Sequence, residues 1–208
     1  MDYPKIFAKS VAAGICIGIG TAVQLSCDNK YIGAFLFSIG LFYICCFKLN
    51  LYTGRVGYII EHQNKPNILL IWLGNLTGCL MCCIPLRIVR PEFAETASII
   101  MKRKIQGGVF ELIIEGVFCG IIMFFAVEGF VSHKDIIAKY LGILLSVPIF
   151  ILCGFEHSIA DMCYSIYMIS SINTLKDSSL VVMAVSISNA VGAILINYLL
   201  TMNHKYQA

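Results

Sequence analysis

The sequence predicts an all-α membrane protein: six transmembrane helices in an inverted three-plus-three repeat, with the second and fifth helices broken. Its 208 residues are 59% hydrophobic and only 13% charged, whereas soluble domains are about half apolar and a quarter charged. At roughly 20 residues per span, this length holds about six spans. The net charge of +3 does not indicate a nucleic-acid partner. We therefore predict a single transmembrane domain over residues 1–208.

The first three spans differ in how continuous they are. Residues 6–25 form an apolar run that we interpret as a retained helix, because no small-residue cleavage site follows an h-region. The second segment, residues 31–60, is too long for one span, and Lys48, Asn50 and Arg55 lie in its middle. Such residues are costly at bilayer depth unless they face a cavity or a partner. We predict a break at Thr53–Gly54 between two half-helices. Residues 68–84 form the third span.

The second half of the chain repeats this pattern after a basic connection. Residues 87–106 have the apolar spacing of an interfacial amphipathic helix, whose basic side chains we expect to contact lipid phosphates. The fourth span covers residues 111–130 and the sixth covers residues 180–200. The fifth segment, residues 140–168, has Glu156, His157 and Asp161 at its centre. Three ionisable residues so close together do not fit a lipid-facing helix.

The order of continuous and interrupted spans in the two halves of the chain indicates an internal repeat. Gly14-x-x-x-Gly18 in the first span resembles Gly116-x-x-x-Gly120 in the fourth, and both second segments are interrupted. Because each half has three spans, an odd number, the halves must have opposite topology. Interrupted helices at corresponding positions of an inverted repeat are typical of a transport site.

The ten cysteines do not predict a disulfide framework or a metal site. Most lie inside apolar runs, where a thiol behaves as a small hydrophobic group. Cys79, Cys82 and Cys83 are close in sequence, but no histidine or carboxylate lies among them. We predict no metal and no cofactor.

At its interrupted segments the chain resembles the formate/nitrite transporter family of small-anion channels. Residues 154–162 read G-F-E-H-S-I-A-D-M, which matches the family motif G-F-E-H-S-I-A-N-M except at Asp161. Residues 50–54, N-L-Y-T-G, are similar to the family's acidic-L-F-T-G/S loop. Gly74–Asn75 and residues 116–120 fall where the family has its G-N and G-x-x-x-N patterns. The resemblance covers nearly the whole chain.

The resemblance implies a channel for small monovalent anions of weak acids, such as formate, nitrite or hydrosulfide. His157 would be the central histidine and Thr53 its hydrogen-bonding opposite. Glu156 and Asp161 would hold the broken helix by accepting hydrogen bonds from exposed N–H groups. Apolar constrictions would lie on the two sides of the histidine. By the family's spacing, these are Phe37 and Phe150 on one side and Leu41, Leu51 and Tyr52 on the other.

Two departures from the family pattern concern the substrate pathway. Asn50 replaces the acidic loop residue, and Lys48 occupies a position that is usually small. We expect Lys48 either to pair with a carboxylate such as Glu111 or Glu115, or to supply the cation that relatives carry on an N-terminal helix. The asparagine that relatives place near the histidine is Gly120 here.

The resemblance further implies a homopentamer with one pore per protomer, in the cell (inner) membrane, with both termini inside. The protein would then be a transporter and not an enzyme. Two alternatives remain open from the residues. One is a pore for neutral solutes such as urea or water, which shares the broken-helix design. The other is a membrane enzyme that uses His157 with Cys153 or Cys163 in thiol chemistry.

Overall fold

The computed structural model describes residues 2–61, 65–170 and 172–205, and all regular structure within these ranges is helical. The first half contains α1 (Tyr3–Leu25), α2 (Lys30–Cys46), α3 (Tyr52–Arg55), the 3-10 helix η1 (Val56–Ile60) and α4 (Ile68–Val89). The second half contains α6 (Val109–Ser132), α7 (Ile136–Cys153), α8 (Ser158–Met168) and α9 (Ile172–Lys205). Between them lies α5 (Glu92–Gly107). The prediction of an all-α fold is confirmed.

Local capping signals set where several helices begin. The side chains of Asp2, Asn29, Asn67 and Asp135 each accept a hydrogen bond from a backbone N–H of the first turn that follows. Within the described ranges, five helices are long and apolar enough to cross a membrane, namely α1, α4, α6, α7 and α9, and α2 is a shorter apolar helix. The bounds of α1 and α6 lie within three residues of those predicted, whereas α4 ends five residues later than predicted and α9 extends beyond the predicted residues 180–200 at both ends.

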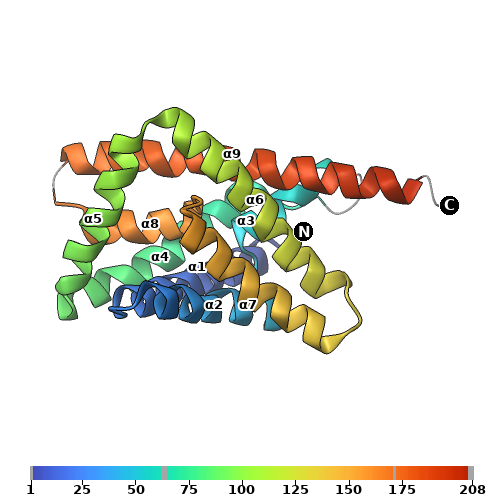
Figure 1. Ribbon diagram of the computed structural model, residues 1–208, viewed down its shortest axis with the longest axis horizontal. Helices are drawn as coiled ribbons and strands as arrows, with labels where there is room; N and C mark the ends of the chain where they lie inside the picture. The colour runs from blue at the N-terminus through green and yellow to red at the C-terminus, as the bar shows by residue number, and fades with distance from the viewer. Residues whose placement is uncertain (1, 62–64, 171, 206–208) are drawn as a thin grey trace.

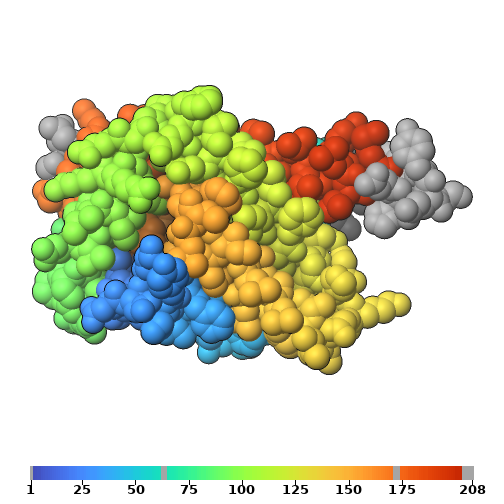
Figure 2. Space-filling view, in the orientation of Figure 1, coloured from blue at the N-terminus to red at the C-terminus, as the bar shows by residue number. Residues whose placement is uncertain are grey.

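The two halves run in opposite directions along the long axis of the molecule (Figure 1). In that view α6 is antiparallel to α1, and α9 is antiparallel to α4. Helix α5 lies across one end of the bundle and packs against α8. Figure 2 shows α7 in orange on the outer face beside α2 in blue, where both helices expose apolar side chains such as Phe35 and Leu145.

Close helix contacts at two glycines show which residues of the two halves correspond, and they correct the predicted alignment of the repeat. A Cβ on Gly14 would lie 2.1 Å from the backbone oxygen of Asn75, and one on Gly120 would lie 2.2 Å from that of Asn189. Gly14 of α1 therefore corresponds to Gly120 of α6, not to Gly116 as predicted. Both glycines allow the first helix of each half to touch the last one backbone to backbone.

An asparagine holds each interruption in place. Asn75 accepts a hydrogen bond from Tyr52 N at 2.8 Å and donates to the backbone oxygens of Ser10 and Asn50. In the second half, Asn189 accepts from Ser158 N at 3.0 Å. It donates to the backbone oxygens of Gly116 and Glu156. Each amide thus satisfies one N–H and one carbonyl group at the break, which the helix ends leave unpaired, and ties the break to the first helix of its half.

The first break lies earlier than the sequence predicted. Helix α2 ends at Cys46, and Thr53 and Gly54 are inside α3 instead of between two half-helices. Lys48 turns the chain with a positive φ of 52°, an unusual conformation for a residue other than glycine. The second break, between α7 and α8, falls within the predicted centre, and Gly154 adopts the left-handed conformation at the end of α7.

Candidate functional site

Two cavities lie toward opposite ends of the molecule. The first, which we call the α5 cavity, has a volume of about 530 Å³ and is lined by Lys30, at the start of α2, and Glu111, at the start of α6. The second, the η1 cavity, has a volume of about 760 Å³ and is lined by Cys45 and Val131, near the ends of those same helices. The interrupted segments come together between the two cavities.

Thr53 and His157 meet between these cavities. The Thr53 Oγ1 atom lies 3.0 Å from His157 Nε2, and the two side chains are 0% and 2% exposed. His157 is the N-cap of α8 and lines the α5 cavity. Thr53 comes from α3, and the next residue, Gly54, lines the η1 cavity. The contact between His157 and Thr53 that the resemblance implied is present in the structure.

The second ring nitrogen of His157 fixes which atom donates in this contact. Ala160 N donates a hydrogen bond to His157 Nδ1 at 3.1 Å, so Nδ1 acts as an acceptor and carries no proton. In the neutral imidazole the proton then lies on Nε2. The Nε2–H group therefore donates to Thr53 Oγ1, and the Thr53 hydroxyl keeps its own proton for another acceptor.

Aromatic and aliphatic side chains surround this polar pair. The Phe150 ring stacks on the His157 ring with centroids 5.4 Å apart, and it meets the edge of Phe37 at 6.0 Å. Leu41 and Leu51 are fully buried, and Leu51 lines the η1 cavity. The structure thus places Phe150 against the His157 ring and Phe37 against Phe150. The role of these residues, and of Leu41 and Leu51, as constrictions stays a prediction.

Tyr52 is placed differently from the other predicted constriction residues. Its hydroxyl donates to the backbone oxygen of Ser186 on α9 at 2.9 Å, and its side chain is buried. This bond ties α3 to α9.

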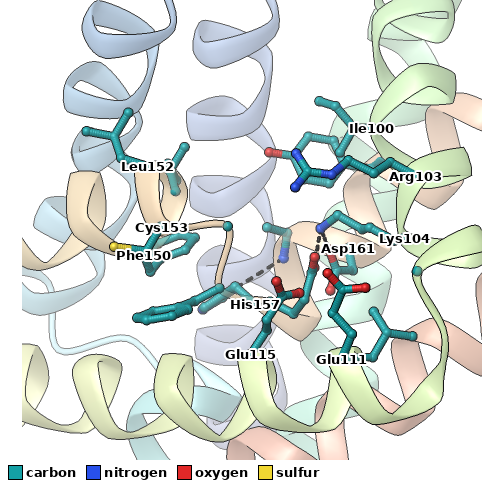
Figure 3. Close-up of a pocket in the computed structure, with 18 of the residues that line it drawn as sticks. Ile100, Arg103, Lys104, Glu111, Glu115, Phe150, Leu152, Cys153, His157 and Asp161 are labelled. Carbon is teal, nitrogen blue, oxygen red and sulfur yellow. Dashed lines mark hydrogen bonds and ion pairs between the residues drawn. The ribbon is translucent and has the colours of Figure 1, made fainter.

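The prediction for Glu156 and Asp161 was wrong. Both carboxylates accept hydrogen bonds from Lys104 Nζ, which reaches them from α5. The backbone N–H groups at the start of α8 bond instead to Asn189 and to the His157 ring. In Figure 3, Lys104 points from α5 toward Asp161 beside the acidic side chains of α6. Lys104 therefore faces inward. The expectation that this side chain contacts lipid phosphates was wrong.

The sequence held a signal for Lys104. The buried residues of α5 are Phe93, Ala97 and Met101, and Lys104 lies on the same face because it follows Met101 by three positions. A basic residue in line with the buried stripe of an amphipathic helix indicates an inward ion pair.

The expected partners of Lys48 were also wrong. Glu111 and Glu115 line the α5 cavity, whereas the exposed Lys48 lines the η1 cavity. The backbone oxygen of Lys48 accepts a hydrogen bond from Lys9 Nζ. Asn50 is half-buried, and its side chain donates to the backbone oxygen of Ile6 at 3.4 Å.

The two cavities differ in formal charge. Four acidic and three basic side chains line the α5 cavity, a sum of −1: Glu111, Glu115, Glu156, Asp161, Lys30, Arg103 and Lys104. Two acidic and three basic side chains line the η1 cavity, a sum of +1: Glu61, Glu128, Lys48, Arg55 and Lys139. Glu128 accepts from the Tyr58 and Ser132 hydroxyls, and none of the three basic groups is in a salt bridge with a described residue.

Over the ranges that the structure describes, no cluster of His, Cys, Asp and Glu side chains is arranged to hold a metal ion.

Opposed halves, interrupted helices and a buried polar pair between two cavities define a membrane protein of the inverted-repeat transport type. The family model for formate/nitrite transporters matches residues 1–203. The chain belongs to the formate/nitrite transporter family. As a member with several membrane-spanning helices, it is a multi-pass protein of the inner membrane.

Individual relatives agree with this assignment. The chain is 24% identical over 180 residues to the formate channel FocA of Haemophilus influenzae, covering 75% of this chain and 63% of that protein. It is 24% identical over 182 residues to FocA of Escherichia coli K12, covering 76% and 64%. The chain thus matches less than two thirds of the length of these relatives.

Solved structures share the fold. A structure described as a pentameric formate channel with formate bound has a TM-score of 0.81, 20% identity and 98% coverage of both chains. An FNT family ion channel has a TM-score of 0.80, 15% identity and covers 99% of this chain and 89% of its own.

Proposed function

We propose that this protein is a channel for small monovalent anions of weak acids, such as formate, nitrite or hydrosulfide. The whole chain would form one transmembrane channel domain, with a pore in each protomer of a homopentamer. The observation that carries the proposal is the buried Thr53–His157 hydrogen bond between two cavities of the protein. Family membership and the formate channels among the relatives support the substrate class.

The Thr53 hydroxyl is the group that would meet the anion. Its oxygen accepts from His157 Nε2–H, which leaves the hydroxyl proton free to donate to a carboxylate or nitrite oxygen. A hydrogen bond donated to a charged acceptor is stronger than one between neutral groups. This donor offsets part of the cost of moving an anion out of water.

The cations of the η1 cavity would bring anions to this point. Lys48, Arg55 and Lys139 give this cavity a positive formal charge, which raises the local concentration of small anions. Lys48 would thus act as a surface cation at the mouth and not as a buried salt-bridge partner. From there the anion would pass Leu51 and the Thr53–His157 pair, then Phe150, to reach the α5 cavity.

Stopped-flow light scattering on proteoliposomes tests the proposal. We expect formate, nitrite or hydrosulfide gradients to relax faster in vesicles that contain the protein than in protein-free vesicles of the same lipid. Urea and water permeability should match those of the empty vesicles. Selective urea or water permeability would favour the neutral-solute pore instead. No added permeability for any of the anions would contradict a channel function.

A further inference from the structure

The Lys104 cluster holds one more negative charge than its cation can balance. Glu156 and Asp161 both accept from the single ammonium of Lys104. Their side chains are only 6% and 0% exposed, so solvent screens this charge poorly. With both carboxyl groups ionised, the cluster would carry a formal charge of −1 beside the proposed anion pathway.

The two carboxyl groups meet at one point, which provides a place for a proton. Lys104 Nζ donates both to Glu156 Oε2 and to Asp161 Oδ1, so the two carboxyl groups share one binding site. Two carboxyl oxygens form a hydrogen bond only when one of them carries a proton, and two carboxylates that share one site keep a proton between them. The Oδ2 atom of Asp161 is also buried without a donor among the described residues. A buried acceptor left without a donor is costly.

We propose that Glu156 and Asp161 share a single proton, which makes their cluster with Lys104 electrically neutral. The proton sits between two carboxyl oxygens, and the ammonium of Lys104 binds the remaining negative charge. On the proposed function, this proton also lets the α5 cavity admit an anion, because the cavity's formal charge rises from −1 to zero.

Other titratable groups face the pair from the neighbouring elements. Those close to it belong to α5, to α6, to the segment before α8 and to α8 itself: Lys104, Arg103, Glu111, Glu115, Cys119, His157 and Tyr164. Lys104 is the cation bound to the pair, and Glu111 and Glu115 add negative charge nearby (Figure 3). The two glutamates of α6 therefore favour retention of the proton.

The shared proton predicts a pH dependence of transport. When the pH rises enough to remove the proton, the cavity becomes negative and repels the anion. Anion flux should therefore fall at high pH in the wild type. Asp161→Asn leaves one carboxylate opposite Lys104 at every pH, so the fall attributable to the pair should be lost.

Infrared spectroscopy of the reconstituted, substrate-free protein tests the proton directly. We expect the C=O stretch of a protonated carboxyl group in the wild type at neutral pH, and its loss when the pH is raised. The band should be missing in Asp161→Asn and in Glu156→Gln. Glu115→Gln is the matched control: it removes an acid of the same cavity that is not bound to Lys104, and the band should remain.

A wild type with no such band at neutral pH would overturn the proposal. So would a band that survives Asp161→Asn, or one that disappears in Glu115→Gln but not in Glu156→Gln. If Asp161→Asn does not fold, the pH titration of the wild type and Glu156→Gln decide the matter. A protein with the band but without anion flux would contradict the proposed function and leave the shared proton in place.

Discussion

Thr53 and His157 contribute differently at the scale of single residues, because the direction of their hydrogen bond is fixed. His157 Nδ1 is occupied by Ala160 N–H, so the ring orients the threonine and does not itself offer a free donor. Protonation of His157 at Nδ1 would place an N–H group against the N–H group of Ala160 and break the Ala160–His157 hydrogen bond. On the proposed function, the ring would therefore act through Thr53 in this state, and Thr53 would be the donor to the anion.

This difference predicts how two substitutions combine. Thr53→Val removes the donor, and we expect anion flux to fall about tenfold, since a hydrogen bond to a charge is worth ~1.5 kcal/mol or more. His157→Asn removes the group that orients the donor and should also lower the flux. The double variant should be no worse than Thr53→Val alone, because both changes act on one hydrogen-bonded unit. Initial rates of formate flux into proteoliposomes measure all three.

Thr21→Val is the matched control for Thr53→Val. Thr21 is a fully buried threonine of α1 whose hydroxyl donates to Ile17 O of its own helix. It should leave the flux close to the wild type. A multiplicative loss in the double variant would show that Thr53 and His157 act independently.

At the scale of elements, the apolar pattern predicted the helices well and their interruptions less well. Long apolar runs are local signals, and they gave α1, α4, α6 and α9. The first break was placed at Thr53–Gly54 from composition, but it is set by Asn75, which lies on α4 and bonds to Asn50 O and Tyr52 N. No local pattern near residue 50 shows where this distant amide will bind. Lys104 was misplaced for a similar reason, because its partners follow it by more than 50 residues.

The two asparagines should therefore be equally important for stability. We expect Asn189→Leu to lower the melting temperature of the solubilised protein by about 5–10 °C, because it removes three hydrogen bonds and leaves Ser158 N and Glu156 O, which are buried at the break, without that partner. Asn75→Leu should cost about the same, because Asn75 makes the equivalent three bonds in the other half. Thermal unfolding followed by fluorescence-detected size exclusion measures both.

Thr77→Val serves as the control on α4, because the Thr77 hydroxyl bonds only to Leu73 O of its own helix among the described residues. It should leave the melting temperature within a degree or two of the wild type. If Asn75→Leu were as mild as Thr77→Val, the asparagine would not hold the first break.

At the scale of the whole molecule, the protomer leaves wide apolar surfaces uncovered. On α7, side chains such as Ile137, Leu145 and Leu152 are exposed, and on α2 the same is true of Ile32 and Phe35. Lipid and neighbouring protomers are the two surroundings that such surfaces fit. The Thr53–His157 pair, by contrast, lies wholly within one chain. A pore built around it belongs to the protomer and not to the centre of an assembly.

Mixed oligomers separate these two locations of the pore. Native mass spectrometry should first give about 115 kDa, which is five times the protomer mass of 23.0 kDa. Wild-type and Thr53→Val chains with different affinity tags are then co-expressed, and oligomers that contain both are purified and reconstituted. If every protomer conducts separately, formate flux should fall in proportion to the share of Thr53→Val chains, because each variant chain slows only its own pathway. A pathway at the symmetry axis would be lined by all the chains at once, so a single variant chain would reduce the flux of the whole oligomer. A steep, non-linear fall would therefore contradict the pore assigned to each protomer, whatever the number of subunits.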